Sequence, residues 1–171
     1  MNSVQRRKYI EELLNKSDEP QKGHVIAEKL GVTRQIIVKD IAILRAEGKK
    51  VIATPDGYII PRQDNNLVRK VIAVSHKPAD IEDELETIIK YGGIVEDVIV
   101  EHKIYGEIKA MLMLKNFYDI ENFMINVNKY NSEPLLILTG GLHLHTISAE
   151  NHGIIKNILK ELKIKNYLVS D

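Results

Sequence analysis

The spacing of apolar residues divides the chain into two parts. In the first 60 residues apolar side chains recur every three or four positions, the period of an amphipathic α-helix. Thr33 can cap a helix, and Gly31 suits the left-handed end of the helix before it. A short hairpin around the turn sequence PDG then follows. The pattern therefore predicts three helices before the hairpin, over residues 4–15, 23–30 and 34–48.

Strand and helix periods alternate in the remainder of the chain, which predicts an α+β protein whose second part is an α/β sandwich. The segment 94–114 reads as one or two strands that turn near Gly106. The other expected strands cover 67–76, 141–148 and 166–171, and the expected helices cover 79–91, 116–130 and 151–164.

The sequence PRQDNN, residues 61–66, is the one convincing linker, because a proline is followed by polar turn formers without periodicity. It predicts a first domain over residues 1–62 and a second over residues 67–171.

Composition narrows the functional classes. The 171 residues carry no net charge, but residues 1–62 have 12 Lys/Arg against 8 Asp/Glu, and residues 63–171 have 12 against 16. A basic first part is compatible with a nucleic-acid module. The absence of cysteine excludes disulfides and cysteine-ligated zinc. Without a signal peptide or a long apolar run, we expect a cytoplasmic protein with no membrane partner.

The first domain has the element order of a winged helix-turn-helix. We expect Gln35 and Ile36, at the start of the third helix, to contact base edges in the major groove. Thr33 beside them is also expected to lie at the DNA, and the expected phosphate contacts are Arg34, Lys39, Lys49 and Lys50. The alternative is a small helical domain that serves in dimerisation or protein contact. LGVTRQIIVKDIAILRAEG resembles the helix-turn-helix of biotin-operon-type bacterial regulators.

Two histidines, His143 and His145, stand two residues apart in an apolar strand and so share one face of it. His76 ends the first strand of the second domain, and Glu84 follows on the next helix. If the two strands are neighbours, three imidazoles and one carboxylate converge, a set that suits zinc, nickel, cobalt, iron or copper. The alternative is that these are hydrogen-bonded structural histidines. A neighbouring acid can orient one of them, with Asp80, Glu82 and Asp83 in reach.

His102 shares a strand face with Val98 and Val100, which indicates a core residue or the wall of a pocket. Tyr105 and Gly106 follow it and read as a structural turn, although the tyrosine ring could also stack against a ligand. His102 and Tyr105 are therefore the candidate ligand-binding pair.

The segments IAVSHKPADIEDEL, HKIYGEI and TGGLHLHTI, in this order behind a helix-turn-helix, resemble the three-histidine (3H) domain of the niacin-responsive repressors of the NiaR family. The resemblance implies that His76, Glu84, His143 and His145 bind one divalent transition metal per chain, nickel or zinc. It also implies nicotinic acid as effector, a homodimer, and control of genes for NAD biosynthesis or niacin uptake.

The hypothesis is a repressor that binds a palindromic double-stranded operator more tightly when niacin, its co-repressor, occupies the metal-containing domain. A metal-dependent hydrolase fused to a DNA-binding domain is the alternative from another class. A third reading is a structural metal in a domain that only dimerises.

Overall fold

A computed structural model describes residues 1–61, 66–130 and 132–169 of the chain. The chain forms two compact units, Met1–Gln63 and Asp64–Asp171, and each is described by itself. Of the expected linker at 61–66, residues 62–65 lie outside the described part. Within the described residues, no helix combines the length and the apolar character needed to cross a membrane.

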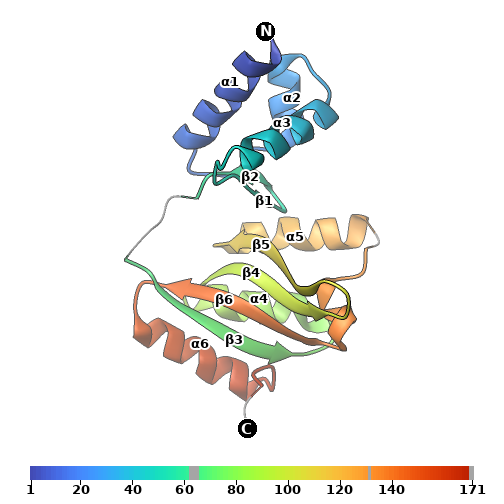
Figure 1. Ribbon diagram of the computed structural model, residues 1–171. Coiled ribbons are helices and arrows are strands. Elements are labelled where there is room, and N and C mark those ends of the chain that lie inside the picture. Colours follow the sequence, from blue (N-terminus) through green and yellow to red (C-terminus); the bar gives the residue numbers. More distant parts are fainter. Residues whose placement is uncertain (62–65, 131, 170–171) are drawn as a thin grey trace. The chain divides into compact units, whose positions relative to one another are not determined.

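The first unit is a three-helix domain with a small antiparallel hairpin (Figure 1). The Asn2 side chain and Gln5 form a capping box at the start of α1, and Thr33 caps α3 by accepting a hydrogen bond from the Ile36 amide. Gly31 ends α2 with a φ of 63°, in the left-handed region that favours glycine. Its elements are α1 (Ser3–Lys16), α2 (Gly23–Leu30), α3 (Arg34–Ala46), β1 (Ile52–Thr54) and β2 (Gly57–Ile59).

The core of the first unit lies between its helices. Apolar residues at helical spacing on α1, α2 and α3 are buried together, among them Ile10, Ile26 and Ile37. Asp40 on α3 is also buried, and it pairs with Arg6 of α1 at 2.5 Å between Oδ2 and Nε. The apolar contacts and this ion pair together fix α1 across α3, which leaves the opposite face of α3 exposed.

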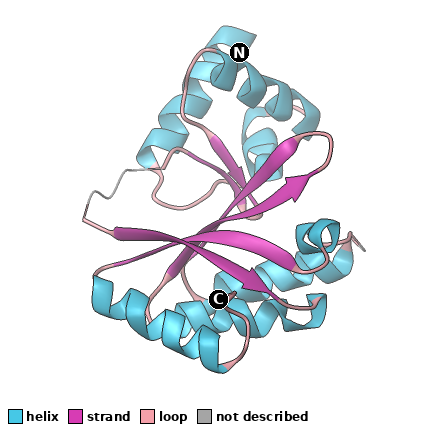
Figure 2. Ribbon diagram, turned by 60° about the horizontal axis from the view of Figure 1, so that its bottom comes forward, coloured by secondary structure: helices cyan, strands magenta, loops and turns pink. Residues whose placement is uncertain are grey.

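The second unit is a four-stranded antiparallel sheet in the order β3-β6-β4-β5. Its three α-helices lie on one face of the sheet (Figure 2), so the unit has two layers. The strands are β3 (Val68–Ser75), β4 (Ile94–His102), β5 (Gly106–Leu114) and β6 (Leu142–Ala149). The helices are η1 (Pro78–Asp80), α4 (Ile81–Lys90), α5 (Phe117–Lys129), η2 (Leu135–Thr139) and α6 (His152–Ile164).

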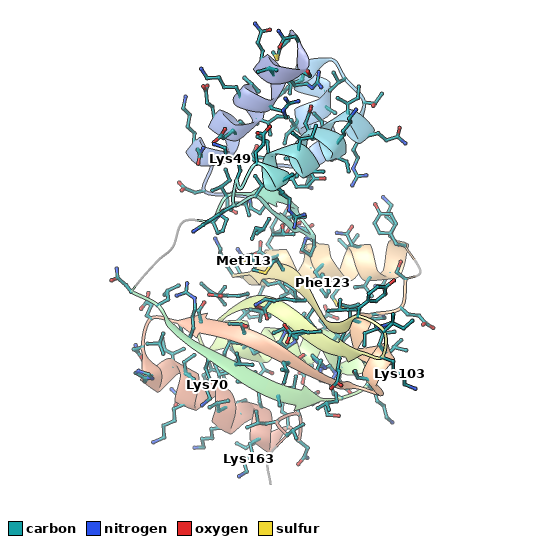
Figure 3. The ribbon with its side chains drawn as sticks, in the orientation of Figure 1. Lys49, Lys70, Lys103, Met113, Phe123 and Lys163 are labelled. Atoms are coloured by element: carbon teal, nitrogen blue, oxygen red, sulfur yellow. The ribbon has the colours of Figure 1, made fainter. Side chains whose placement is uncertain are left out.

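The core of the second unit lies between the sheet and these helices. Alternate residues of each strand, such as Ile72, Val95 and Ile147, meet apolar residues of α4 and α6, such as Leu85 and Ile158. On the outer side of α6, Lys163 points away from the sheet (Figure 3). The helix-facing side of the sheet therefore carries this apolar core.

Two predictions about the second unit need correction. The segment 166–171 is not a strand over its described part: Asn166 has a φ of 60°, and Leu168 makes a single bridge to Val74. A left-handed residue interrupts the extended backbone that a strand needs. The second correction is the short helix η2, which was not predicted because five residues are too few for a helical period to show. Segment 94–114, in contrast, forms two strands as one of the two expected possibilities.

Candidate metal centre and nucleic-acid interface

The two histidines of β6 lie on its helix-facing side, with Ile147 and Ala149 of the core. Strands β3 and β6 are antiparallel neighbours, and His143 and His145 lie opposite Val74 and Ile72. His76 follows the last residue of β3, where its amide lies 3.4 Å from the carbonyl of Gly141, just before β6. The topology therefore brings all three histidines to one end of the sheet, as the sequence predicts if these strands are neighbours.

Glu84 lies in the first turns of α4 and faces the three imidazoles. Its Oε2 is 2.8 Å from the Nε2 of His76 and 3.6 Å from the Nε2 of His143, and its Oε1 is 3.3 Å from the Nε2 of His145. All four side chains are between 1% and 4% exposed. The candidate ligand set is thus assembled around one buried carboxylate.

The second ring nitrogen of each histidine is held by a backbone carbonyl. The Nδ1 atoms of His76, His143 and His145 lie 2.8, 2.8 and 2.6 Å from the carbonyl oxygens of Lys77, Gly141 and Asp97. Since a carbonyl only accepts hydrogen bonds, each Nδ1 must carry a proton and donate it. In the neutral ring the lone pair is then on Nε2, the atom directed at Glu84, which is the arrangement found in histidines that bind metals.

The donor set fits a divalent transition metal. Nitrogen and oxygen ligand atoms of His76, Glu84 and His143 lie within 4.8 Å of one another. His145 adds its Nε2 through the contact with Glu84 Oε1, an oxygen that is buried and has no hydrogen-bond partner among the described residues. A buried acceptor without a partner is expensive, and a cation would satisfy it. Three imidazoles with one carboxylate suit zinc or nickel better than calcium or magnesium.

The electrostatics of the cluster favour ionised groups. Burial by itself raises the pKa of the Glu84 carboxyl, but the positive charge of His145 and the hydrogen-bonding imidazoles around it hold this pKa well below its usual value. Burial likewise lowers the pKa of His76 and of His145, yet Glu84 outweighs burial and raises both. Without metal, the cluster therefore favours protonated imidazoles at His76 and His145 beside an ionised Glu84, and a metal ion would compete with those protons.

Asp97 is a residue of the site that sequence reasoning missed. It lies in β4 at a register shift between Val95 and Asp97, and it is 1% exposed. Its carbonyl accepts from His145, while its carboxylate accepts from the Thr146 amide at 2.9 Å and pairs with Lys109 at 2.8 Å. The signal in the sequence was a pair of acids, Glu96 and Asp97, inside the otherwise apolar run IVEDVIV.

Of the three acids in reach of the histidines, Asp83 has its partners outside the cluster. The Asp83 carboxylate binds Lys165 at 2.7 Å and the Tyr167 hydroxyl at 2.8 Å. Burial, followed by this bond to Asp83, raises the pKa of Tyr167 to about 12, so the phenol stays protonated. The Tyr167 ring lies 5.2 Å from the His76 ring and supports it from outside the cluster.

His102 and Tyr105, the candidate ligand-binding pair, lie at the tip of the β4–β5 hairpin, which Lys103 marks in Figure 3. The His102 Nδ1 accepts hydrogen bonds from the amides of Ile104 and Tyr105 at 3.2 and 3.3 Å, and the Tyr105 side chain is 76% exposed. His102 thus organises the turn. The histidine is only partly buried, although Val100 on the same strand face is in the core.

The residues expected to contact DNA lie where a recognition helix would present them. Arg34, Gln35, Ile36 and Lys39 are exposed on α3, on the side away from Ile37. Val38 is exposed on the same helix and is a further apolar candidate that the spacing argument missed. Thr33 is exposed and caps α3, so its hydroxyl also has a structural role.

The two lysines that precede the β1–β2 hairpin, Lys49 and Lys50, differ in their contacts. Lys49, labelled in Figure 3, pairs with Glu11 of α1 at 2.7 Å, and this contact raises the pKa of the lysine. Lys50 is exposed beside it. Because the Lys49 ammonium group is already paired with the Glu11 carboxylate, Lys50 is the better candidate for a phosphate contact.

Known families match both halves of the chain. A helix-turn-helix domain family matches residues 6–59, and the 3H domain family matches residues 69–171. A probable transcription repressor NiaR from Thermotoga maritima is 40% identical over 167 residues, 98% of this chain and 95% of that relative. A transcription repressor NadR from Bacillus subtilis is 34% identical over 161 residues, 92% of this chain and 89% of that relative.

The protein is therefore a two-domain transcription regulator with an N-terminal helix-turn-helix. It belongs to the NiaR family of transcription repressors. The resemblance found in the sequence is confirmed, and so are the α+β fold and the assignment as a regulator in preference to a hydrolase.

Proposed function

We propose that the protein represses genes of NAD biosynthesis or niacin uptake, with nicotinic acid as co-repressor and one nickel or zinc ion held by His76, Glu84, His143 and His145. Family membership supports the repressor role. The observation that carries the sensor role is the convergence of three Nε2 atoms on the buried carboxylate of Glu84. A structural ion pair would need only one of these histidines.

Each metal-binding residue has a separate part in this proposal. His76 comes from the end of β3, His143 and His145 from β6, and Glu84 from α4, so one ion would join two strands and a helix. When bound, the metal supplies a rigid cross-link and a local positive charge. The three backbone carbonyls fix the rings in place before binding, which lowers the cost of ordering the site.

We propose further that two chains associate and bind a palindromic operator. Two recognition helices must then lie about 34 Å apart to enter successive major grooves on one side of the DNA. Nicotinic acid acts by favouring the chain arrangement with this spacing. A coupling of roughly 1–3 kcal/mol between the two sites changes operator affinity about 5- to 150-fold.

Gel-shift titration of the metal-loaded full chain on a palindromic operator, with and without nicotinic acid, tests the co-repressor role. We expect affinity to rise with nicotinic acid and to fall when metal is removed by a chelator. Equal affinities under all three conditions would leave only a structural metal in a dimerising domain.

A pair of histidine variants tests the assignment of the metal site. His143→Ala removes a ligand atom and should abolish both metal binding and the niacin response, while basal DNA binding remains. His152→Ala changes an exposed histidine at the start of α6 and is the matched control. If elemental analysis finds the same metal content in both variants, the ligand assignment is wrong.

A further inference from the structure

The side chains of the candidate metal cluster are between 1% and 4% exposed, so an ion cannot reach them unless part of the surrounding wall moves. Around the cluster lie β3, β6, α4, the turn between η2 and β6, and the five residues that follow α6. We call these five residues, 165–169, the strap. Entry and exit of an ion depend on which of these segments can move.

Most of the wall is tied to the ligands themselves. Strand β6 and helix α4 carry ligands, β3 leads directly into His76, and all three contribute to the apolar core. The turn before β6 supplies the Gly141 carbonyl, which accepts a hydrogen bond from the His143 ring. None of these segments can move without displacing a ligand.

The strap is attached differently. It turns back from the end of α6 to the end of β3 (Figure 1), where its backbone is held by hydrogen bonds to Ala73 and Ser75. It provides neither a ligand nor one of the carbonyls that orient the three rings, and each of its residues is at least partly exposed. The Tyr167 ring lies 5.2 Å from the His76 ring, and both residues line a cavity at the end of β3. If this ring turned outward, His76 would open to the cavity.

One partly exposed contact holds the Tyr167 side chain in place. Its hydroxyl donates a hydrogen bond to the Asp83 carboxylate at 2.8 Å, and Lys165 binds the same carboxylate at 2.7 Å. The Asp83 side chain is 51% exposed, and contacts of charged groups that reach water contribute little stability. The bond between Tyr167 and Asp83, which we call the latch, therefore orients the ring and can still break often.

We propose that the Tyr167 side chain, held by its latch to Asp83, is the gate through which a metal ion enters and leaves the cluster. The proposal rests on the metal site proposed above and adds control of its exchange rate. When the hydroxyl leaves Asp83, the ring turns away from His76 and the ion can pass. Loss of the latch affects the metal-free and the metal-bound protein equally, so it speeds entry and exit by the same factor and leaves the affinity unchanged.

Zinc exchange in the full chain provides the test. An excess of a chromophoric chelator measures the exit rate from the zinc-loaded protein, and mixing the metal-free protein with zinc measures the entry rate. Tyr167→Phe keeps the ring beside His76 but removes the hydroxyl, and we expect both rates to rise about 3- to 10-fold, the usual effect of one lost hydrogen bond. Tyr118→Phe on α5 is the matched control, because Tyr118 is 68% exposed and lies outside the strap. Its rates should equal those of the unmodified protein.

A second pair of variants tests the latch. Asp83→Ala removes the acceptor of the hydroxyl and should also speed the exit of zinc. In the Asp83→Ala background, Tyr167→Phe should have no further effect on the exit rate, because the bond that it removes is already gone. A further rise in that rate would show that Tyr167 acts without Asp83 and would overturn the latch.

The possible failures are distinguishable. If Tyr167→Phe exchanges zinc at the rates of the unmodified protein, the ion passes another part of the wall and the gate is overturned. If exit becomes faster while entry does not, the zinc affinity falls, and Tyr167 then only supports the His76 ring. If the unmodified chain binds no zinc, the metal site proposed above fails, and the gate fails with it.

Discussion

At the scale of single residues, the candidate metal centre depends on groups that touch no metal. Asp97 is the clearest case, because its carbonyl orients His145 while its carboxylate fixes the shifted register of β4 from the other face of the sheet. The histidine and its support thus come from adjacent strands. A sequence shows neither relation, since Asp97 and His145 meet only through strand pairing.

Replacing Asp97 should therefore weaken metal binding. We expect Asp97→Ala to lower metal affinity about 10- to 100-fold, the usual effect of losing a residue that supports a ligand. Asp97→Asn keeps an acceptor for the Thr146 amide and should lose less. Competition with a chromophoric chelator measures both, with Glu96→Ala at the neighbouring position as control. Unchanged affinity in Asp97→Ala would contradict the positioning role.

The pKa shifts of the cluster predict a pH optimum for the metal-free second unit. The lowered pKa of Glu84 stabilises the fold above the carboxyl's ordinary value of 4.5, and this contribution is lost as pH falls. The raised pKa values of His76 and His145 stabilise it below 6.5, and this contribution is lost as pH rises through the raised values. The cluster should contribute most between 4.5 and 6.5.

Urea unfolding of the chelator-treated protein checks this optimum. The urea concentration at the unfolding midpoint of the second unit should be lower at about pH 8 than at about pH 6. In Glu84→Gln, which removes the charged partner, the fall should be much smaller. A urea midpoint that is higher at pH 8 than at pH 6 would contradict the raised pKa values of His76 and His145.

At the scale of elements, the hydrophobic period was sufficient for the regular helices and strands. Apolar spacing located α1, α3 and α6 because each has one buried stripe. The failures fall where backbone conformation decides, as at Asn166, whose left-handed φ ends the expected last strand. The alternation of β6 placed His143 and His145 on one face, but only the pairing of β6 with β3 brings His76 to them.

The turn between η2 and β6 gives a prediction about an element. Gly141→Ala would bring a Cβ within 2.5 Å of the His76 carbonyl oxygen at a φ of 106°, so the β3 end must shift. Gly140→Ala meets no atom within 4 Å and suffers only the strain of its φ, about 1–2 kcal/mol.

Thermal unfolding and metal titration separate the two variants. Both should be less stable than the unmodified protein, but only Gly141→Ala should also lose metal affinity. Equal metal affinities would show that the backbone at His76 can move without disturbing the ring.

At the scale of the whole molecule, the chain forms two units with separate cores. The sequence showed this division through the change from a purely helical period to alternating strands and helices. It could not show how ligand binding in one unit reaches the other, because such coupling depends on the assembled molecule.

Metal should therefore stabilise the second unit selectively. At a free metal concentration of about 100 times the dissociation constant, the gain is about 2.7 kcal/mol. Hydrogen exchange should slow in β3, β6 and α4 and stay unchanged in α1 and α3. If protection rises equally in both units, the units unfold together and the division into separate cores does not hold energetically.

The pairing of β3 with β6 also has a consequence for synthesis. These strands are the first and the last of the second unit, so a ribosome releases β6 only after the other strands of this unit have been made. A truncated product that ends before Leu142 would lack the imidazoles of His143 and His145, even if its remaining elements fold. Metal binding would thus require a complete second unit, and fragments that contain only the helix-turn-helix domain and part of the sheet would stay metal-free.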